Sequence, residues 1–176
     1  MKDRTVGIAG PLVVLVALLV AFAAYVTMTM NEAPVRLATH FDADGEPNDW
    51  MTRGGYRAFI LGFGFGVPAL MVALFWIIAK LGGRGLNVPN KDYWLAPERR
   101  ESALAFIRRH GVWIACIQVG FFAALHHLTL AANALEPPRL PAPELIAIVA
   151  CFLGGTGLWV IVLLRRFGRP ATEPAP

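Results

Sequence analysis

The residues best suited to chemistry lie in one short polar stretch between two apolar runs. Residues 38–50 read ATHFDADGEPNDW and hold His40, Asp42, Asp44 and Asp49. Imidazole and carboxylate groups this close in sequence are candidate ligands for a divalent metal, either calcium, which prefers oxygen ligands, or zinc, which also accepts histidine. The alternative is a tight turn, because Asp, Gly, Pro and Asn shape turns and aspartates hydrogen-bond their own backbone.

Two further histidines, His126 and His127, are adjacent within an apolar run, near Gln118, Thr129 and Asn133. Polar groups inside a membrane segment are costly and tend to face the bundle interior or a wet cavity. Because neighbouring helix positions point about 100° apart, one histidine can face inward, toward the His40 stretch, while the other faces elsewhere. The alternative is that both histidines only pack helices through hydrogen bonds. A ligand site, or a site for a divalent metal cofactor, would use His40, Asp42, Asp44, Asp49, His126 and His127.

Composition shows which elements must position these residues. The chain has 176 residues, 56% of them apolar and 16% charged, with a mean hydropathy of +0.54. Soluble domains are about 45–50% apolar and about 25% charged, so the composition excludes a soluble enzyme and a disordered chain. Four runs of 27, 22, 25 and 20 residues carry no Asp, Glu, Lys or Arg: 5–31, 58–79, 111–135 and 145–164.

A span needs about 20 apolar residues, and in hydrocarbon its backbone must be helical to satisfy its own polar groups. The sequence therefore predicts an all-α, polytopic four-helix transmembrane bundle in contact with the lipid bilayer. The expected segments are a tail (1–7), four spans (8–30, 58–80, 111–134 and 145–165), two extracytoplasmic loops (31–57 and 135–144), a cytoplasmic loop with an amphipathic helix (81–110) and a tail (166–176).

The distribution of Lys and Arg predicts the orientation. Twelve of the 16 cations fall on the side that holds both termini and the 81–110 loop. Cytoplasmic loops carry the excess of Lys and Arg, so we expect both termini in the cytoplasm and a multi-pass protein of the bacterial inner membrane. The sequence pI of about 9.5 is then a signature of topology, and no nucleic-acid partner is expected.

The 81–110 loop has the residue types of a contact surface. It contains NVPNKDYWLAPERRE at residues 87–101, in which the aromatic rings suit the headgroup layer and the cations suit anionic lipid. Pro97 with Glu98 is typical of a helix start, and we expect that helix to run on into the third span. Docking of a cytoplasmic protein partner is the alternative to lipid contact. The predicted contact residues are Asn87, Pro89, Asn90, Lys91, Tyr93, Trp94, Arg99 and Arg100.

Small residues within the spans predict close helix packing, in this chain or in a homo-oligomer. Gly62 and Gly66 have the GxxxG spacing, and Gly154 and Gly157 recur in the fourth span. Two cysteines, Cys116 and Cys151, fall at different depths of their spans, so we expect two free, buried thiols.

The two loops carry a family resemblance. The stretch from Pro34 to Trp50, with Thr39-His40-Phe41 and Asp44-Gly45, resembles the signature of the bacterial domain-of-unknown-function family 1648, and residues 87–95 are similar to a second block of that family. The resemblance implies a membrane domain without assigned chemistry over spans one to three. Some relatives join this domain to one of the SdpI immunity-protein family, which protects a bacterium from its own secreted toxin and can hold a transcriptional repressor at the membrane.

Three functional hypotheses follow. The first is a non-enzymatic membrane protein, immunity- or signalling-like, whose His/Asp loop meets a ligand and whose basic aromatic loop meets a partner or lipid. The second is a metal-dependent membrane hydrolase, although the sequence holds no HExxH, GxSxG or Walker pattern. The third is an accessory subunit of a transporter or of a larger membrane complex.

Overall fold

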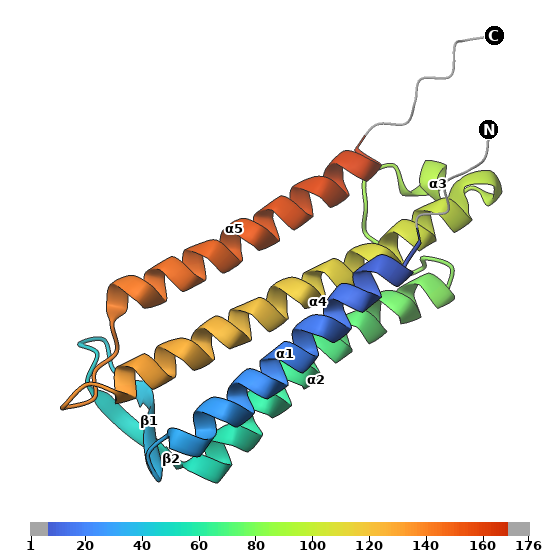
Figure 1. The fold of residues 1–176 in the computed structure, drawn as a ribbon. Coiled ribbons are helices and arrows are strands. Elements are labelled where there is room, and N and C mark those ends of the chain that lie inside the picture. The colour runs from blue at the N-terminus through green and yellow to red at the C-terminus, as the bar shows by residue number, and fades with distance from the viewer. Residues whose placement is uncertain (1–6, 169–176) are drawn as a thin grey trace.

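The computed structural model describes residues 7–168, and residues 1–6 and 169–176, which make up most of the two expected tails, lie outside it. Four long helices run antiparallel to their neighbours in the chain, with a β-hairpin between the first two (Figure 1). The elements are α1 (Ala9–Glu32), β1 (Arg36–Phe41), β2 (Pro47–Thr52), α2 (Arg53–Lys80), α3 (Lys91–Trp94), α4 (Pro97–Asn133) and α5 (Ala142–Phe167).

The four long helices are each long and apolar enough to cross a membrane, which confirms the predicted all-α, four-helix class. Many of their large apolar side chains are exposed, among them Val13 at 68%, Leu70 at 70% and Ile146 at 67%. Such side chains are unfavourable in water and suit a lipid surround. The start of α1 and the end of α5 lie at the same end of the bundle, and the hairpin lies at the other (Figure 1).

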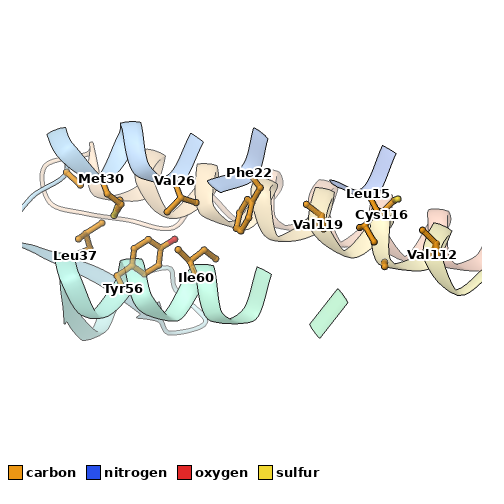
Figure 2. Packing of buried hydrophobic residues seen from close by; sticks show 12 residues of the cluster. Leu15, Phe22, Val26, Met30, Leu37, Tyr56, Ile60, Val112, Cys116 and Val119 are labelled. Atoms are coloured by element: carbon orange, nitrogen blue, oxygen red, sulfur yellow. The ribbon is translucent and has the colours of Figure 1, made fainter. Parts of the chain in front are cut away.

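The core lies where α1, α2 and α4 meet. Phe22, Val26 and Met30 of α1 pack there with Ile60 of α2 and Val119 of α4 (Figure 2). Two glycines let the helices approach: a side chain at Gly64 would collide with Phe22, and one at Gly111 would collide with Phe75. Close approach at glycine is how helices gain contact in lipid, where there is no hydrophobic drive.

The glycines predicted to pack are not the ones that do so within the chain. A Cβ added at Gly62, Gly66, Gly154 or Gly157 would meet nothing within 4 Å. The GxxxG pair points away from α1 and α4 because Gly64, midway between its members, occupies the inward face. Any role of these four glycines in a homo-oligomer stays a prediction.

Helix α5 packs mainly on α4. His110 Nε2 and the Trp159 carbonyl oxygen are 2.9 Å apart, and Trp159 Nε1 donates to the His110 carbonyl at 2.9 Å, with the two rings stacked. Phe121 stacks on Phe152 farther along. Between these contacts α5 buries little, and both cysteines are free as expected, but Cys151 is exposed on α5 and only Cys116 is buried.

The hairpin was not predicted. Its strands pair antiparallel, with Ala38 opposite Trp50 and His40 opposite Asp49. Strand β2 leads directly into α2, whose first turn is capped by Thr52, since its Oγ1 accepts from the Gly55 amide at 3.1 Å. Helix α2 therefore begins at Arg53, five residues before the apolar run that marks the expected second span.

Candidate functional site

The hairpin turn is built by one aspartate. Asp42 Oδ1 accepts from the amides of Asp44 and Glu46, each at 3.0 Å, and Gly45 takes a positive φ of 82° that glycine adopts without strain. This arrangement is the tight turn that the sequence offers as the alternative to a calcium loop. Its backbone amides already bond to one carboxylate oxygen of Asp42. The side chain of Asp44, in the same turn, is exposed.

The turn is also tied to the segment that joins α4 to α5. The Leu140 amide donates to the Gly45 carbonyl at 2.9 Å, and Arg139 donates to the Asp44 carbonyl at 3.0 Å. Arg139 lies 3.6 Å from a carboxylate oxygen of Glu46 as well. These contacts hold the tip of the hairpin over the end of the bundle.

Asn133, the last residue of α4, fixes the middle of β1. Its Oδ1 accepts from the Ala38 amide at 2.7 Å, and its Nδ2 donates to the Ala38 carbonyl at 2.9 Å. Ala38 is completely buried, so both backbone groups would otherwise lack water as a partner. The hairpin is thus held at two places, at its tip and in the middle of its first strand.

A cavity of about 430 Å³ lies between the hairpin, α2, α4 and the start of α5. Its lining is mostly apolar and aromatic, with polar groups contributed by the hairpin and by two helix residues. The residues that line it are Thr39, His40, Phe41, Asp49, Met51, Tyr56, Phe59, Ile60, Phe63, Phe122, Leu125, Leu128, Thr129, Leu140 and Leu145. A largely apolar pocket with a few polar groups is the usual form of a small-molecule site.

His40 and Asp49 are cross-strand partners, and both line the cavity. The His40 ring is held by Asn48, since Nδ1 lies within hydrogen-bond distance of the Asn48 side-chain oxygen. The Asp49 carboxylate accepts from the Trp50 amide at 2.7 Å. The hairpin therefore presents one imidazole and one carboxylate side by side to whatever enters the cavity.

Beneath the cavity, His126 joins three helices. Its Nδ1 lies 3.1 Å from the Tyr56 hydroxyl on α2, and its Nε2 lies 2.8 Å from Thr29 Oγ1 on α1. Because the Thr29 hydroxyl is 2.8 Å from the Tyr25 carbonyl and donates to it, Nε2 carries the proton and the Tyr56 hydroxyl donates to Nδ1. His126 is fully buried, and all its polar atoms are satisfied.

His127 faces away from this network. It is exposed, and its Nδ1 lies 2.9 Å from the Tyr25 hydroxyl on α1. The structure thus brings His40 and Asp49 together at the cavity, places His126 behind Tyr56, and leaves His127, Asp42 and Asp44 outside the cavity lining. Among residues 7–168, no three His, Cys, Asp or Glu side chains group as they would to hold a metal ion.

At the other end of the bundle, the predicted contact residues hold the end of α5. Asn90 Nδ2 donates to the carbonyls of Phe167 and Gly168 at 2.9 and 3.1 Å, and Trp94 Nε1 donates to Phe167 at 3.1 Å. These donors satisfy carbonyls that a helix end leaves open. The guanidinium of Arg166 lies 4.1 Å from the centre of the Trp94 ring, which adds a cation–π contact.

The remaining contact residues are tied locally or exposed. Arg99 covers the Tyr93 ring at 3.9 Å and donates to the Tyr93 carbonyl at 3.0 Å. Lys91 Nζ lies 3.4 Å from the Arg84 carbonyl. Asn87, Pro89 and Arg100 are exposed. Helix α4 begins at Pro97 and continues unbroken to Asn133, as expected from the Pro97-Glu98 start.

The sequence could not have indicated Tyr56, Thr29 or Phe122 as parts of this end of the bundle. Each looks like an ordinary residue of an apolar segment, and each gains its role from a contact with a distant helix. The polar residues within apolar runs were the available signal, because such groups must find partners inside the bundle.

Comparison with known proteins adds one assignment. No curated protein and no solved structure matches the chain. The family match stops within α2, so the likeness of residues 87–95 to a second block stays a prediction. Residues 12–72, which span most of α1, the hairpin and the first part of α2, match the family described as Domain of unknown function (DUF1648), as the Pro34–Trp50 stretch predicted.

Proposed function

We propose that this chain is a non-enzymatic, multi-pass protein of the bacterial cytoplasmic membrane that binds an amphipathic ligand at its hairpin end, in an immunity- or signalling-like role. The observation that carries the proposal is the cavity of about 430 Å³ beneath the hairpin. Aromatic walls from Phe59, Phe63 and Phe122 suit an apolar ligand body, and the His40–Asp49 pair suits its polar end.

Charge supports an orientation with the hairpin outside the cell. Of the 16 Lys and Arg residues, nine lie in the described part of the chain toward the end opposite the hairpin, and three more belong to residues 1–6 and 169–176, outside the described part. By the positive-inside rule, that end lies in the cytoplasm, with both termini. A ligand secreted by the cell or by a neighbour then reaches the cavity without crossing the membrane.

The segment around α3 supplies the cytoplasmic contact in this proposal. Its aromatic residues Tyr93 and Trp94 are half-buried against Arg99 and the end of α5, while Asn87 and Pro89 remain exposed. A partner protein that contacts these exposed residues would lie against the end of α5. Ligand capture outside and partner contact inside are the two requirements of a signalling role.

Binding of dansyl-undecanoic acid, an amphipathic fluorescent probe, to the purified full chain in detergent tests the proposal. Leu125 lines the cavity, so Leu125→Trp fills it, and we expect probe binding to weaken at least about tenfold. His40→Ala should also weaken binding, by less, because it removes only a contact to the polar end. Protein-free micelles give the background.

Leu70→Trp is the matched control. It adds the same bulk to α2 at a side chain that is 70% exposed and does not line the cavity. We expect its probe affinity to equal that of the unchanged chain. Equal affinity for Leu125→Trp and Leu70→Trp, with both variants folded, would contradict a ligand site in the cavity.

A further inference from the structure

A second pocket lies at the α3 end of the bundle, where α2 ends. It has a volume of about 340 Å³ and is lined by Lys80, Leu81, Gly82, Arg84 and Arg100. Three of its five lining residues carry a positive charge and none carries a negative one. Like charges gathered in one hollow repel each other unless an anion shares the space.

The cations of this pocket have no acidic partner in the described part of the chain. The two ion pairs found within residues 7–168 join Arg108 to Glu101 and Arg139 to Glu46, so neither uses a residue of the pocket. Arg100 donates through Nε to the Leu95 carbonyl at 3.3 Å, which orients its guanidinium and leaves its other donors for a ligand.

The backbone around the pocket fixes its shape. Gly82 and Gly83 take positive φ values of 68° and 79°, and their amides bond back to the Ala79 and Ile78 carbonyls, which ends α2 in a tight turn. Leu95 packs close against Gly83, so the turn is held against the start of α4. Arg100 stands in the first turn of that helix, where the dipole adds positive potential.

We infer that this pocket binds a phosphate group, presented by an anionic phospholipid or by a soluble phosphate. A phosphate offers acceptor oxygens to the donors of Arg84 and Arg100 and a negative charge to Lys80. The lipid surface leads directly to the site: Ile77 lies one helical turn before Leu81 on the same face, and the two are 55% and 57% exposed. Acyl chains along that face would place a headgroup phosphate at the pocket.

Native mass spectrometry of the full chain in a neutral detergent tests this inference with three probes: phosphatidylglycerol, phosphatidylcholine and inorganic phosphate. We expect the unchanged chain to retain phosphatidylglycerol in preference to phosphatidylcholine. The double variant Arg84→Gln/Arg100→Gln should bind phosphatidylglycerol at least about tenfold more weakly, because it removes both guanidinium groups that would donate to the phosphate oxygens in the pocket.

The matched control is Arg109→Gln/Arg165→Gln, which removes the same two charges at the same end without touching the pocket lining. Its affinity should stay within about twofold of the unchanged chain. Equal loss in both double variants would mean diffuse attraction to a basic surface and would overturn the pocket. Displacement of phosphatidylglycerol by inorganic phosphate would support the pocket and identify a soluble phosphate as its occupant.

Two measurements keep the test independent of folding and of the hairpin cavity. The single variant Arg84→Gln changes only one exposed side chain and should still show a graded loss. Binding of dansyl-undecanoic acid should be unchanged in all these variants, because the cavity is lined by hairpin residues and the hairpin lies at the start of α2, whereas the basic pocket is lined by residues at its end. Figure 1 shows the hairpin at the end of the bundle opposite α3.

Discussion

At the scale of single residues, the side chain of Asn133 fixes the position of the hairpin at the end of the bundle. Asn133 reaches Ala38, which is 95 positions away in the chain, and satisfies both of its backbone groups. The sequence showed a polar residue at the end of an apolar run but not its partner, because the partner is main chain. Contacts of this kind arise only when the fold brings distant segments together.

Asn133→Leu should therefore destabilise the chain. The change keeps a similar volume but removes the two hydrogen bonds to Ala38 and a third to the Thr129 carbonyl. It leaves the buried Ala38 amide and carbonyl unpaired, a cost of about 2–3 kcal/mol. Thermal unfolding of the purified chain in detergent measures the loss. Asn31→Leu, at an exposed side chain near the same end, should have little effect. An equal drop in unfolding temperature in the two variants would contradict a stabilising role for the hydrogen bonds between Asn133 and Ala38.

The two adjacent histidines follow the division that helix geometry predicts. His126 is buried between Tyr56 and Thr29, and His127 is exposed beside Tyr25. What the sequence could not distinguish was a packing histidine from a ligand-binding one, because both need the same inward position. The hydrogen bonds indicate that His126 is a packing histidine, because both of its ring nitrogens already bond to Tyr56 and Thr29 within the bundle.

At the scale of elements, the apolar runs predicted the helices well and the polar connections poorly. The residues of β1, RLATHF, are too few and too weakly alternating to stand out beside the turn signals of Asp42 and Gly45. Asn133 holds β1, and the α4–α5 connection holds the hairpin turn, and no local sequence pattern contains either contact. The GxxxG spacing did not identify the glycines that pack within the chain, since it indicates a smooth helix face but not what covers that face.

Asn90, the residue that precedes α3, allows a second test of stability. This residue has a positive φ of 52° and caps the end of α5 through its side chain. Asn90→Gly permits the positive φ without strain but removes the side-chain hydrogen bonds to the end of α5, which should lower the free energy of unfolding by about 1 kcal/mol. Asn90→Ala should cost about 1–2 kcal/mol more, because alanine is strained in the left-handed region.

Unfolding midpoints of the two Asn90 variants separate these effects. Asn87→Gly and Asn87→Ala serve as controls at an exposed asparagine without a positive φ. Identical midpoints for Asn90→Gly and Asn90→Ala would show that the left-handed conformation of residue 90 does not contribute. Equal unfolding midpoints for Asn90→Gly and the unchanged chain would show that the side-chain cap on the end of α5 does not contribute to stability.

At the scale of the whole molecule, α4 organises the bundle. Its 37 residues extend over about 55 Å, well beyond a hydrocarbon thickness of about 30 Å, so part of the helix lies outside the hydrocarbon layer. It packs against α1, α2 and α5, holds the hairpin through Asn133 and contributes Arg100 to the basic pocket. The two proposed sites are therefore at opposite ends of one continuous helix.

Labelling with a membrane-impermeant maleimide on intact cells checks the orientation. In a background with Cys116→Ala and Cys151→Ala, a cysteine in place of exposed Ala43 in the hairpin turn should react. A cysteine in place of exposed Glu98 at the start of α4 should react only after lysis. Reaction of both from outside would contradict the topology that the distribution of cations predicts.

The hydrogen bonds between Asn133 and Ala38 affect how two copies of this protein could associate through the hairpin. The amide of Asn133 presents to β1 the same donor and acceptor that a third strand would bring. That side of the hairpin is therefore closed to edge-to-edge association. On the opposite side, Pro47 at the start of β2 has no N–H to offer. Each edge of the two-stranded sheet therefore has one position, Ala38 on β1 and Pro47 on β2, at which a further strand could not form its usual hydrogen bonds.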